Sequence, residues 1–270
     1  MDSEMNSSAR PGLVEGARGI AGTLTAALYG TMTPHPWLAP DADTDAYSAF
    51  HTCSRMMGWL HDDQERPSLW GMNDADAPTR TSGSEPNSEP VAWFQVEAQR
   101  VARDQPLPAQ PVLQCATAAM TRLGALELDA VQMLLPVQVL DTADAPGPLL
   151  SPSLRTAHWF ADSDPTLRTP VQVTLDSGQS PAIPAVSDVL ASIEQPAFAV
   201  SSYENGHTPI TPWFDDSFWN GPPQHAVVFT GTLAEWSPSA IGWLAGLTAD
   251  LYARHRLTTP LLMTVQRGQA

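Results

Sequence analysis

The chain has 270 residues, of which 43% are hydrophobic, and its formal net charge is −16 at pH 7. All 13 basic side chains are arginines, so chemistry that needs a lysine, such as a Schiff base or a P-loop phosphate contact, is excluded. The acidic balance also argues against a nucleic-acid partner, because phosphate binding needs a dense cationic surface.

Cysteine usage and the N-terminal sequence predict a cytoplasmic protein. Cys53 and Cys115 form no CxxC pair, so the sequence gives no support for a disulfide framework or a zinc site built from thiolates. The apolar stretch 20–29 follows no basic segment and is too short to cross a bilayer. We therefore expect two reduced thiols and no membrane segment.

Residues 1–150 are predicted to form a region of helices and strands. A helix over 46–61 is indicated by apolar residues at helical spacing after Thr44 or Asp45, either of which can cap it. The acidic segment 73–89, which contains prolines and serines, is predicted to be an exposed, mobile loop. The other expectations are a frayed end over 1–12, a helix over 14–31, strands over 91–97 and 112–121, a helix or a strand over 126–140, and a linker over 141–152.

The C-terminal third holds the clearest pattern, a strand–helix–strand unit that occurs twice. Strand-like Val171–Leu175 leads to Ser180-Pro181 and a helix, and strand-like Val227–Leu233 leads to Ser237-Pro238 and a second helix. In both copies serine is a suitable N-cap and proline a suitable first helical residue. Two such units in sequence can build a ferredoxin-like sandwich, which we predict over residues 166–268.

The predicted fold class is therefore α+β, with an antiparallel sheet and helices packed on one face. We consider a duplicated, more diverged unit as one interpretation of the N-terminal half. In the predicted helix 238–256, Ile241, Leu244 and Leu251 form one apolar stripe. Gly242 and Gly246 are spaced for close backbone approach, which we interpret as tight packing inside the protein.

The connection 203–224 is longer than a hairpin between two strands requires. Its aromatic side chains offer large contact areas, and its prolines lower the entropic cost of ordering the loop. We predict that it binds a partner or an apolar ligand; alternatively, it covers an otherwise exposed face of the sheet and its tryptophans belong to the core. The predicted binding residues are Tyr203, His207, Trp213, Phe214, Asp215, Asp216, Phe218 and Trp219.

Two further clusters combine histidine with carboxylates or a thiol. His158, Asp162 and Asp164 are close in sequence but match no metal motif, and Asp164-Pro165 is equally typical of a turn. His51 and Cys53 are two residues apart and do not share a helix face, and His61 is placed at a helix end. We favour a structural interpretation for both clusters.

The leading functional hypothesis is a non-catalytic binding or adaptor protein whose aromatic, acidic loop holds a partner protein or peptide. The alternative is a small-molecule enzyme of specialised metabolism, such as a cyclase or a cofactor-independent oxygenase, with a pocket between sheet and helices. No cofactor or metal is expected, because the sequence holds no nucleotide or metal motif. An enclosed pocket containing His207 or His158 beside a carboxylate would favour the enzyme, and an open apolar patch rimmed by acids would favour the adaptor.

Overall fold

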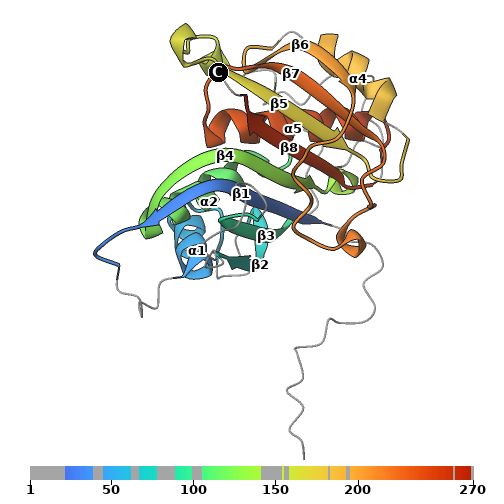
Figure 1. The fold of residues 1–270 in the computed structure, drawn as a ribbon. Coiled ribbons are helices and arrows are strands. Elements are labelled where there is room, and N and C mark those ends of the chain that lie inside the picture. Colours follow the sequence, from blue (N-terminus) through green and yellow to red (C-terminus); the bar gives the residue numbers. More distant parts are fainter. Residues whose placement is uncertain are drawn as a thin grey trace, which may run out of the picture.

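A computed structural model gives the fold of the chain (Figure 1). The structure describes residues 22–38, 45–61, 67–77, 89–98, 105–140, 154, 158–181, 183–192, 195–257 and 259–268. Eight strands form one sheet, in the order β2-β3-β1-β4-β8-β5-β7-β6, and each neighbouring pair is antiparallel. The strands are β1 (Thr23–Pro34), β2 (Trp70–Asp76), β3 (Ala92–Ala98), β4 (Gly124–Leu135), β5 (Thr169–Asp176), β6 (Phe198–Asn205), β7 (Ala226–Leu233) and β8 (Leu261–Arg267).

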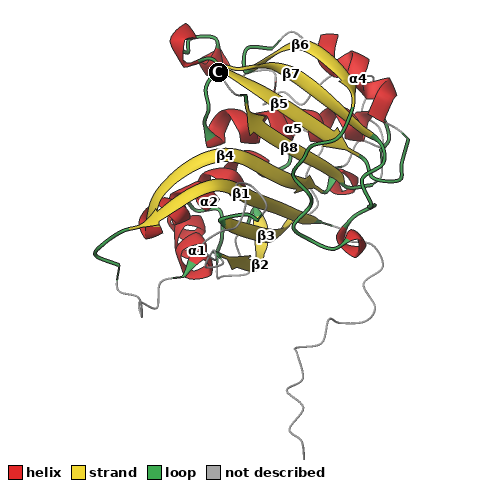
Figure 2. Cartoon of the chain, viewed as in Figure 1, coloured by secondary structure: helices red, strands yellow, loops and turns green. Residues whose placement is uncertain are grey.

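The helices cover one face of this sheet (Figure 2). Within the described residues the α-helices are α1 (Ala46–Met56), α2 (Ala109–Leu123), α4 (Ile183–Ser192) and α5 (Pro238–Arg254). Short 3-10 helices are η1 (Val137–Val139), η2 (His158–Phe160), η3 (Pro165–Leu167) and η4 (Asp216–Phe218). The protein is thus α+β with an antiparallel sheet, as the sequence predicts. None of the helices in these ranges is long and apolar enough to span a membrane.

The two halves of the chain follow the same order of elements, β-α-β-β-α-β. In the first half the strands lie in the order β2-β3-β1-β4, and in the second half they lie in the order β8-β5-β7-β6. The last strands of the halves, β4 and β8, pair along residues 130–135 and 261–266. This pairing makes the sheet continuous across both halves.

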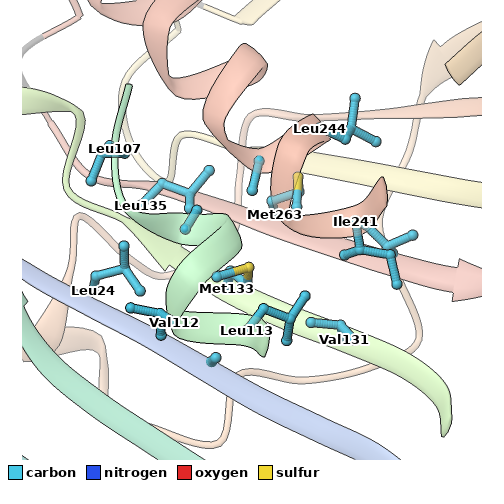
Figure 3. Packing of buried hydrophobic residues seen from close by; sticks show 14 of the residues in the cluster. Leu24, Leu107, Val112, Leu113, Val131, Met133, Leu135, Ile241, Leu244 and Met263 are labelled. Carbon is cyan, nitrogen blue, oxygen red and sulfur yellow. The ribbon is translucent and has the colours of Figure 1, made fainter. Parts of the chain in front are cut away.

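The main core lies between the sheet and the helices, with α2 and α5 over its centre (Figure 3). Alternation along each strand decides which side chains enter it. On β1, Leu24, Ala26 and Leu28 face the helices, whereas Ala27 and Tyr29 belong to a separate cluster on the opposite face. The opposite face is therefore apolar in part as well, and it needs a cover of its own.

Two predicted elements are wrong in type. The segment predicted as a helix over 14–31 contains β1 from Thr23 onward, and the predicted strand 112–121 lies within α2. In β1, Leu24 and Leu28 are four residues apart, a spacing that fits one face of a helix and equally one face of a strand. In α2, Val112 suggests a strand, but the buried positions recur with a period near 3.6 over all fifteen residues.

Other local predictions agree with the structure. Asp45 caps α1, its side chain accepting a hydrogen bond from the Ser48 backbone N–H at 2.7 Å. Ser237 caps α5 in the same way through Ala240 N at 3.1 Å, with Pro238 in the first turn. The predicted strand 91–97 corresponds to β3, and the undecided segment 126–140 is mostly β4. The first copy of the Ser-Pro pattern differs, because α4 begins at Ile183, three residues after Ser180.

Some predictions concern residues outside the described ranges. The frayed end 1–12 and the linker 141–152 both lie there entirely. Of the loop 73–89, residues 73–76 belong to β2, and residues 78–88 are outside the description.

Candidate functional site

The connection between β6 and β7, residues 206–225, crosses the face of the sheet opposite the helices (Figure 1). We call it the β6–β7 loop. Its buried contacts are those of Ile210 with Ala27, Tyr29 and Ala130, and those of Trp219 with Leu134 and Leu262. The loop therefore reaches β4 and β1 of the first half and covers the apolar part of this face.

Three of the aromatic residues selected from the sequence face the sheet. Trp219 is 7% exposed, Trp213 stacks on Trp93 of β3 with ring centroids 4.5 Å apart, and Phe214 meets Trp213 edge-on at 5.4 Å. These contacts agree with the alternative in which the loop covers the sheet. The side chain of Phe218 is outside the description.

The acidic residues and Tyr203 are placed differently. Asp215 and Asp216 are exposed, and Asp215 accepts a hydrogen bond from Ser217 N at 2.8 Å, which lowers the pKa of its carboxyl. Tyr203 lies on β6, tilted against Phe229 of the helix-side core at 5.6 Å, and its hydroxyl donates to Asp188 of α4. Tyr203 is thus on the opposite side of the sheet from the loop.

The loop is anchored by the turn that follows β5. Gly178 has a φ of 61°, and a Cβ atom there would lie 1.7 Å from the carbonyl oxygen of Asn220, so only glycine fits. Gln179 donates from its backbone to Asn220 O at 2.8 Å and from its side chain to Gly221 O at 2.9 Å. His225 N donates back to Gly178 O at 3.2 Å. These bonds hold the end of the loop against the end of β5.

A polar row crosses the sheet beneath this loop. Gln132, Thr264 and Thr174 are direct cross-strand partners on β4, β8 and β5, and all three are buried. Gln132 donates to the Thr264 hydroxyl at 3.1 Å, whereas its side-chain oxygen has no partner in the described part of the chain. The hydroxyl of Tyr29 is buried and unpartnered there as well. A buried polar atom without a protein partner is a place where a water or a ligand atom can bind.

Asp176 at the end of β5 is an ionisable group two residues along the strand from Thr174, on the same face of the sheet. It is 4% exposed, and one carboxylate oxygen accepts from Gly178 N at 2.7 Å. The other oxygen lies 3.8 Å from Nδ1 of His207, whose side chain is 56% exposed. Burial raises the pKa of Asp176, against the opposing effects of the Gly178 N–H and the nearby His207. A buried acid beside an accessible imidazole is an arrangement that can move a proton.

His207 separates two hollows. The smaller is a cavity of about 70 Å³ that includes Thr174, Asp176, Thr208 and Thr264 in its lining. The larger is an open depression of about 420 Å³, with Asn205, Gln224 and His225 at its wall. The depression is within the size range of small-molecule sites, and no arginine is among the described residues that line either hollow.

Sequence reasoning selected His207 but missed Asp176. A signal was present, because Gln172, Thr174 and Asp176 alternate with Val171, Val173 and Leu175, which places the three polar side chains on one strand face. What the sequence does not show is that a loop thirty residues further along covers this face. The desolvation of Asp176 depends on that long-range contact.

The structure also places residues of the other two clusters. Asp164 caps η3 through the Thr166 backbone N–H at 2.9 Å, and Asp162 is exposed. Cys53 and Cys115 are buried free thiols, and burial raises the pKa of Cys115 to about 11. Across the described ranges, no group of three or more His, Cys, Asp or Glu side chains is arranged to hold a metal ion.

Replacing Asp176 with asparagine tests whether the buried acid destabilises the fold. The folded-state pKa is raised, so the carboxyl contributes most to stability below its unfolded pKa of 3.8 and loses that contribution as pH rises through the folded value. Asparagine keeps the acceptor for Gly178 N. We expect Asp176→Asn to raise the thermal midpoint by a few degrees at pH 7, with the gain shrinking toward pH 4, as measured by circular dichroism.

Asp215→Asn is the matched control for that measurement. The pKa of Asp215 is lowered, so its replacement should reduce stability at neutral pH, and the loss should vanish as pH falls through the folded pKa. A lower thermal midpoint for Asp176→Asn at pH 7 would contradict a destabilising buried acid. It would show that the carboxylate stabilises the turn after β5 more than its burial costs.

Relatives offer no guide to this site. No protein-family model matches the chain, and no curated protein is significantly similar to it. The functional argument therefore rests on the geometry of the β6–β7 loop and of the residues beneath it.

Proposed function

We propose that the protein is a small-molecule enzyme that transfers a proton through His207 and Asp176. The observation that carries the proposal is the buried carboxylate with a raised pKa, 3.8 Å from an imidazole that borders both hollows. Buried ionisable groups generally cost stability, and proteins retain them mainly at functional sites. The side-chain directions agree with this proposal, because Trp213 and Trp219 face the sheet and His207 lies beside a carboxylate.

The two residues have different roles in this proposal. His207 is accessible, so its imidazole exchanges the proton with a ligand in the depression. Asp176 orients the ring and stabilises the imidazolium that forms, as buried carboxylates do beside catalytic histidines. Their separation of 3.8 Å is longer than a hydrogen bond, and it shortens when the ligand excludes water, as is common for catalytic contacts.

The linings favour an uncharged or cationic substrate. The described linings contain no arginine that would pair with an anion, whereas Asp176 and the hydroxyls of Thr174 and Thr264 offer acceptors. A cyclisation or isomerisation needs only a proton donor and acceptor at such a place. We therefore favour this reaction class over the oxygenase chemistry that the sequence also left open.

A second candidate is the binding of a partner protein by the outer surface of the β6–β7 loop. It is favoured by Asp215 and Asp216, which are exposed on the loop. The backbone of the loop is held at Asn220 and His225 by hydrogen bonds to the turn after β5. Exposed carboxylates of this kind steer a basic partner and make its binding dependent on salt. In this candidate, Trp213, Phe214 and Trp219 pack on the sheet and hold the outer surface of the loop in place.

Native mass spectrometry after incubation with a small-molecule extract of the host distinguishes the two candidates. We expect a retained small molecule on the wild type that is lost from His207→Gln and kept by a variant combining Asp215→Asn and Asp216→Asn. A retained protein chain that salt releases and that the double variant does not bind would instead support the second candidate. A wild type that retains neither would contradict both.

We also propose that each half of the chain is a ferredoxin-like unit and that the protein is a duplication of that unit. The shared order of elements and the matching strand orders, β2-β3-β1-β4 and β6-β7-β5-β8, support this proposal. β-α-β-β-α-β connectivity is the defining feature of the ferredoxin-like arrangement. A cytoplasmic location is proposed as well, on the support of two cysteines that are both free thiols.

A further inference from the structure

A groove between α1 and α2 lies on the helical side of the protein, away from the β6–β7 loop. Its volume is about 350 Å³, and its lining comprises Cys53, Met56, Met57, Trp59, Gln114, Cys115, Ala118 and Arg122. Most of this lining is apolar, and none of it is acidic. The described lining of the groove thus carries no negative charge, although the net charge of the chain is −16.

The methionines at the end of α1 are unusually exposed for their size. Met56 is 71% exposed and Met57 is 59% exposed, and Trp59 is only partly buried. A further aromatic side chain, Trp37, is 70% exposed beside the end of α2. It stacks on His35, whose ring nitrogen lies 3.0 Å from the carbonyl oxygen of Thr121. Met56, Met57 and Trp59 all line this one groove, and contiguous apolar exposure of this kind marks an interaction site.

The charge of the groove limits what can bind there. Arg122 is exposed, and its guanidinium lies 3.5 Å from the sulfur of Met56. In the ranges that the structure describes, no carboxylate lies within ion-pair distance of it. Arg122 is the charged residue among the described lining residues. An occupant with a carboxylate at this end of the groove can therefore form an ion pair with Arg122 that no described residue provides.

We propose that this groove binds an amphipathic helix of a partner protein, with the partner's apolar face on Met56, Met57 and Trp59 and a carboxylate at Arg122. Grooves between helices commonly bind a third helix in this way. Methionine side chains are flexible and polarisable, so they adapt to different apolar partners. A second copy of this chain is a poorer occupant, because each copy carries sixteen net negative charges that repel the other.

Fluorescence anisotropy with two labelled peptides tests the proposal. Both are amphipathic helices with leucines on one face and glutamines elsewhere; one carries a glutamate at the edge of the apolar face and the other a lysine there. We expect the wild type to bind the glutamate peptide about threefold or more tightly than the lysine peptide, as for a single accessible ion pair. Arg122→Glu should reverse that order.

Met57→Glu should weaken the binding of both peptides about tenfold or more, because it places a charge in the apolar contact. Leu167→Glu is the matched control: Leu167 is 53% exposed on η3, and its replacement should leave both affinities unchanged. Thermal unfolding shows that each variant is folded. The proposal is overturned if Leu167→Glu weakens binding as much as Met57→Glu, or if Arg122→Glu leaves the order of the peptides unchanged. It is equally overturned if sedimentation shows a dimer of the protein that Met57→Glu dissociates.

Discussion

Gly242→Ala is expected to destabilise the protein by about 3 kcal/mol, near the upper end for added volume in a packed interior. A Cβ atom at Gly242 of α5 would lie 2.4 Å from the Cα atom of Gln110 and 3.0 Å from its backbone nitrogen. Both atoms belong to the backbone of α2, so no side chain can rotate away. The helices would have to separate, disturbing the core at its centre and the hydrogen bond between Gln114 and Ser239.

Gly246→Ala is the matched control in the same helix. A Cβ atom there would meet the side chain of Leu154 at 3.6 Å and that of Pro106 at 3.7 Å, which are ordinary contact distances. Alanine is favoured over glycine in a helix interior by about 0.5–1 kcal/mol, so this variant should be as stable as the wild type or more stable. Urea unfolding followed by circular dichroism measures both. Equal effects of the two substitutions would contradict a close crossing of α2 and α5 at Gly242.

The spacing of these two glycines is visible in the sequence. The sequence does not show that a Cβ atom would clash at Gly242 and fit at Gly246. The pattern Gly242, Gly246 predicts close approach along one helix face. Which of the two touches backbone depends on where α2 crosses α5, and the sequence of α5 contains no information about that crossing. The same limit applies to the wrong strand over 112–121, because the face that α2 buries is set by its packing against α5 and α1.

The C-terminal elements were more predictable because local signals agreed with tertiary structure there. The alternation of Val171, Val173 and Leu175 and the cap at Ser237 each specify their element without long-range help. In β1 the spacing of Leu24 and Leu28 fits a helix as well as a strand. Both faces of β1 are buried, so its sequence lacks the alternation of polar and apolar residues that marks a half-exposed strand.

For the candidate site, the sequence predicts which residues matter more readily than whether their side chains face the sheet or the solvent. The sequence selects the long β6–β7 connection and its aromatic residues, and it offers both a binding surface and a cover over the sheet. The choice between a binding surface and a cover depends on whether the strands beneath the loop present apolar or polar side chains to it. Ala27, Ala130 and Leu134 lie in segments whose pairing could not be assigned from sequence, so the tryptophans could not be placed.

Trp219→Ala is expected to lower the free energy of unfolding by about 3–5 kcal/mol, the usual cost of truncating a buried aromatic side chain. Trp219 is 7% exposed and packs on Leu134 and Leu262, so its removal leaves a gap between the loop and the sheet. Trp37→Ala is the control. Its side chain is 70% exposed, and the substitution should change stability by no more than about 0.5 kcal/mol. If Trp219→Ala is as mild as Trp37→Ala, the loop does not cover the sheet as described.

The effects of substitutions at Trp219 and Asp176 on stability should also be coupled. Asn220, the next residue after Trp219, accepts from Gln179 in the turn that holds Asp176 at the end of β5. Loss of the indole frees this end of the loop, admits water to the carboxyl and removes the burial that raises its pKa. In a Trp219→Ala background, Asp176→Asn should therefore lose most of the stabilisation expected at pH 7. A double-mutant cycle at pH 7 measures this coupling, and strict additivity would mean that the loop does not control the environment of Asp176.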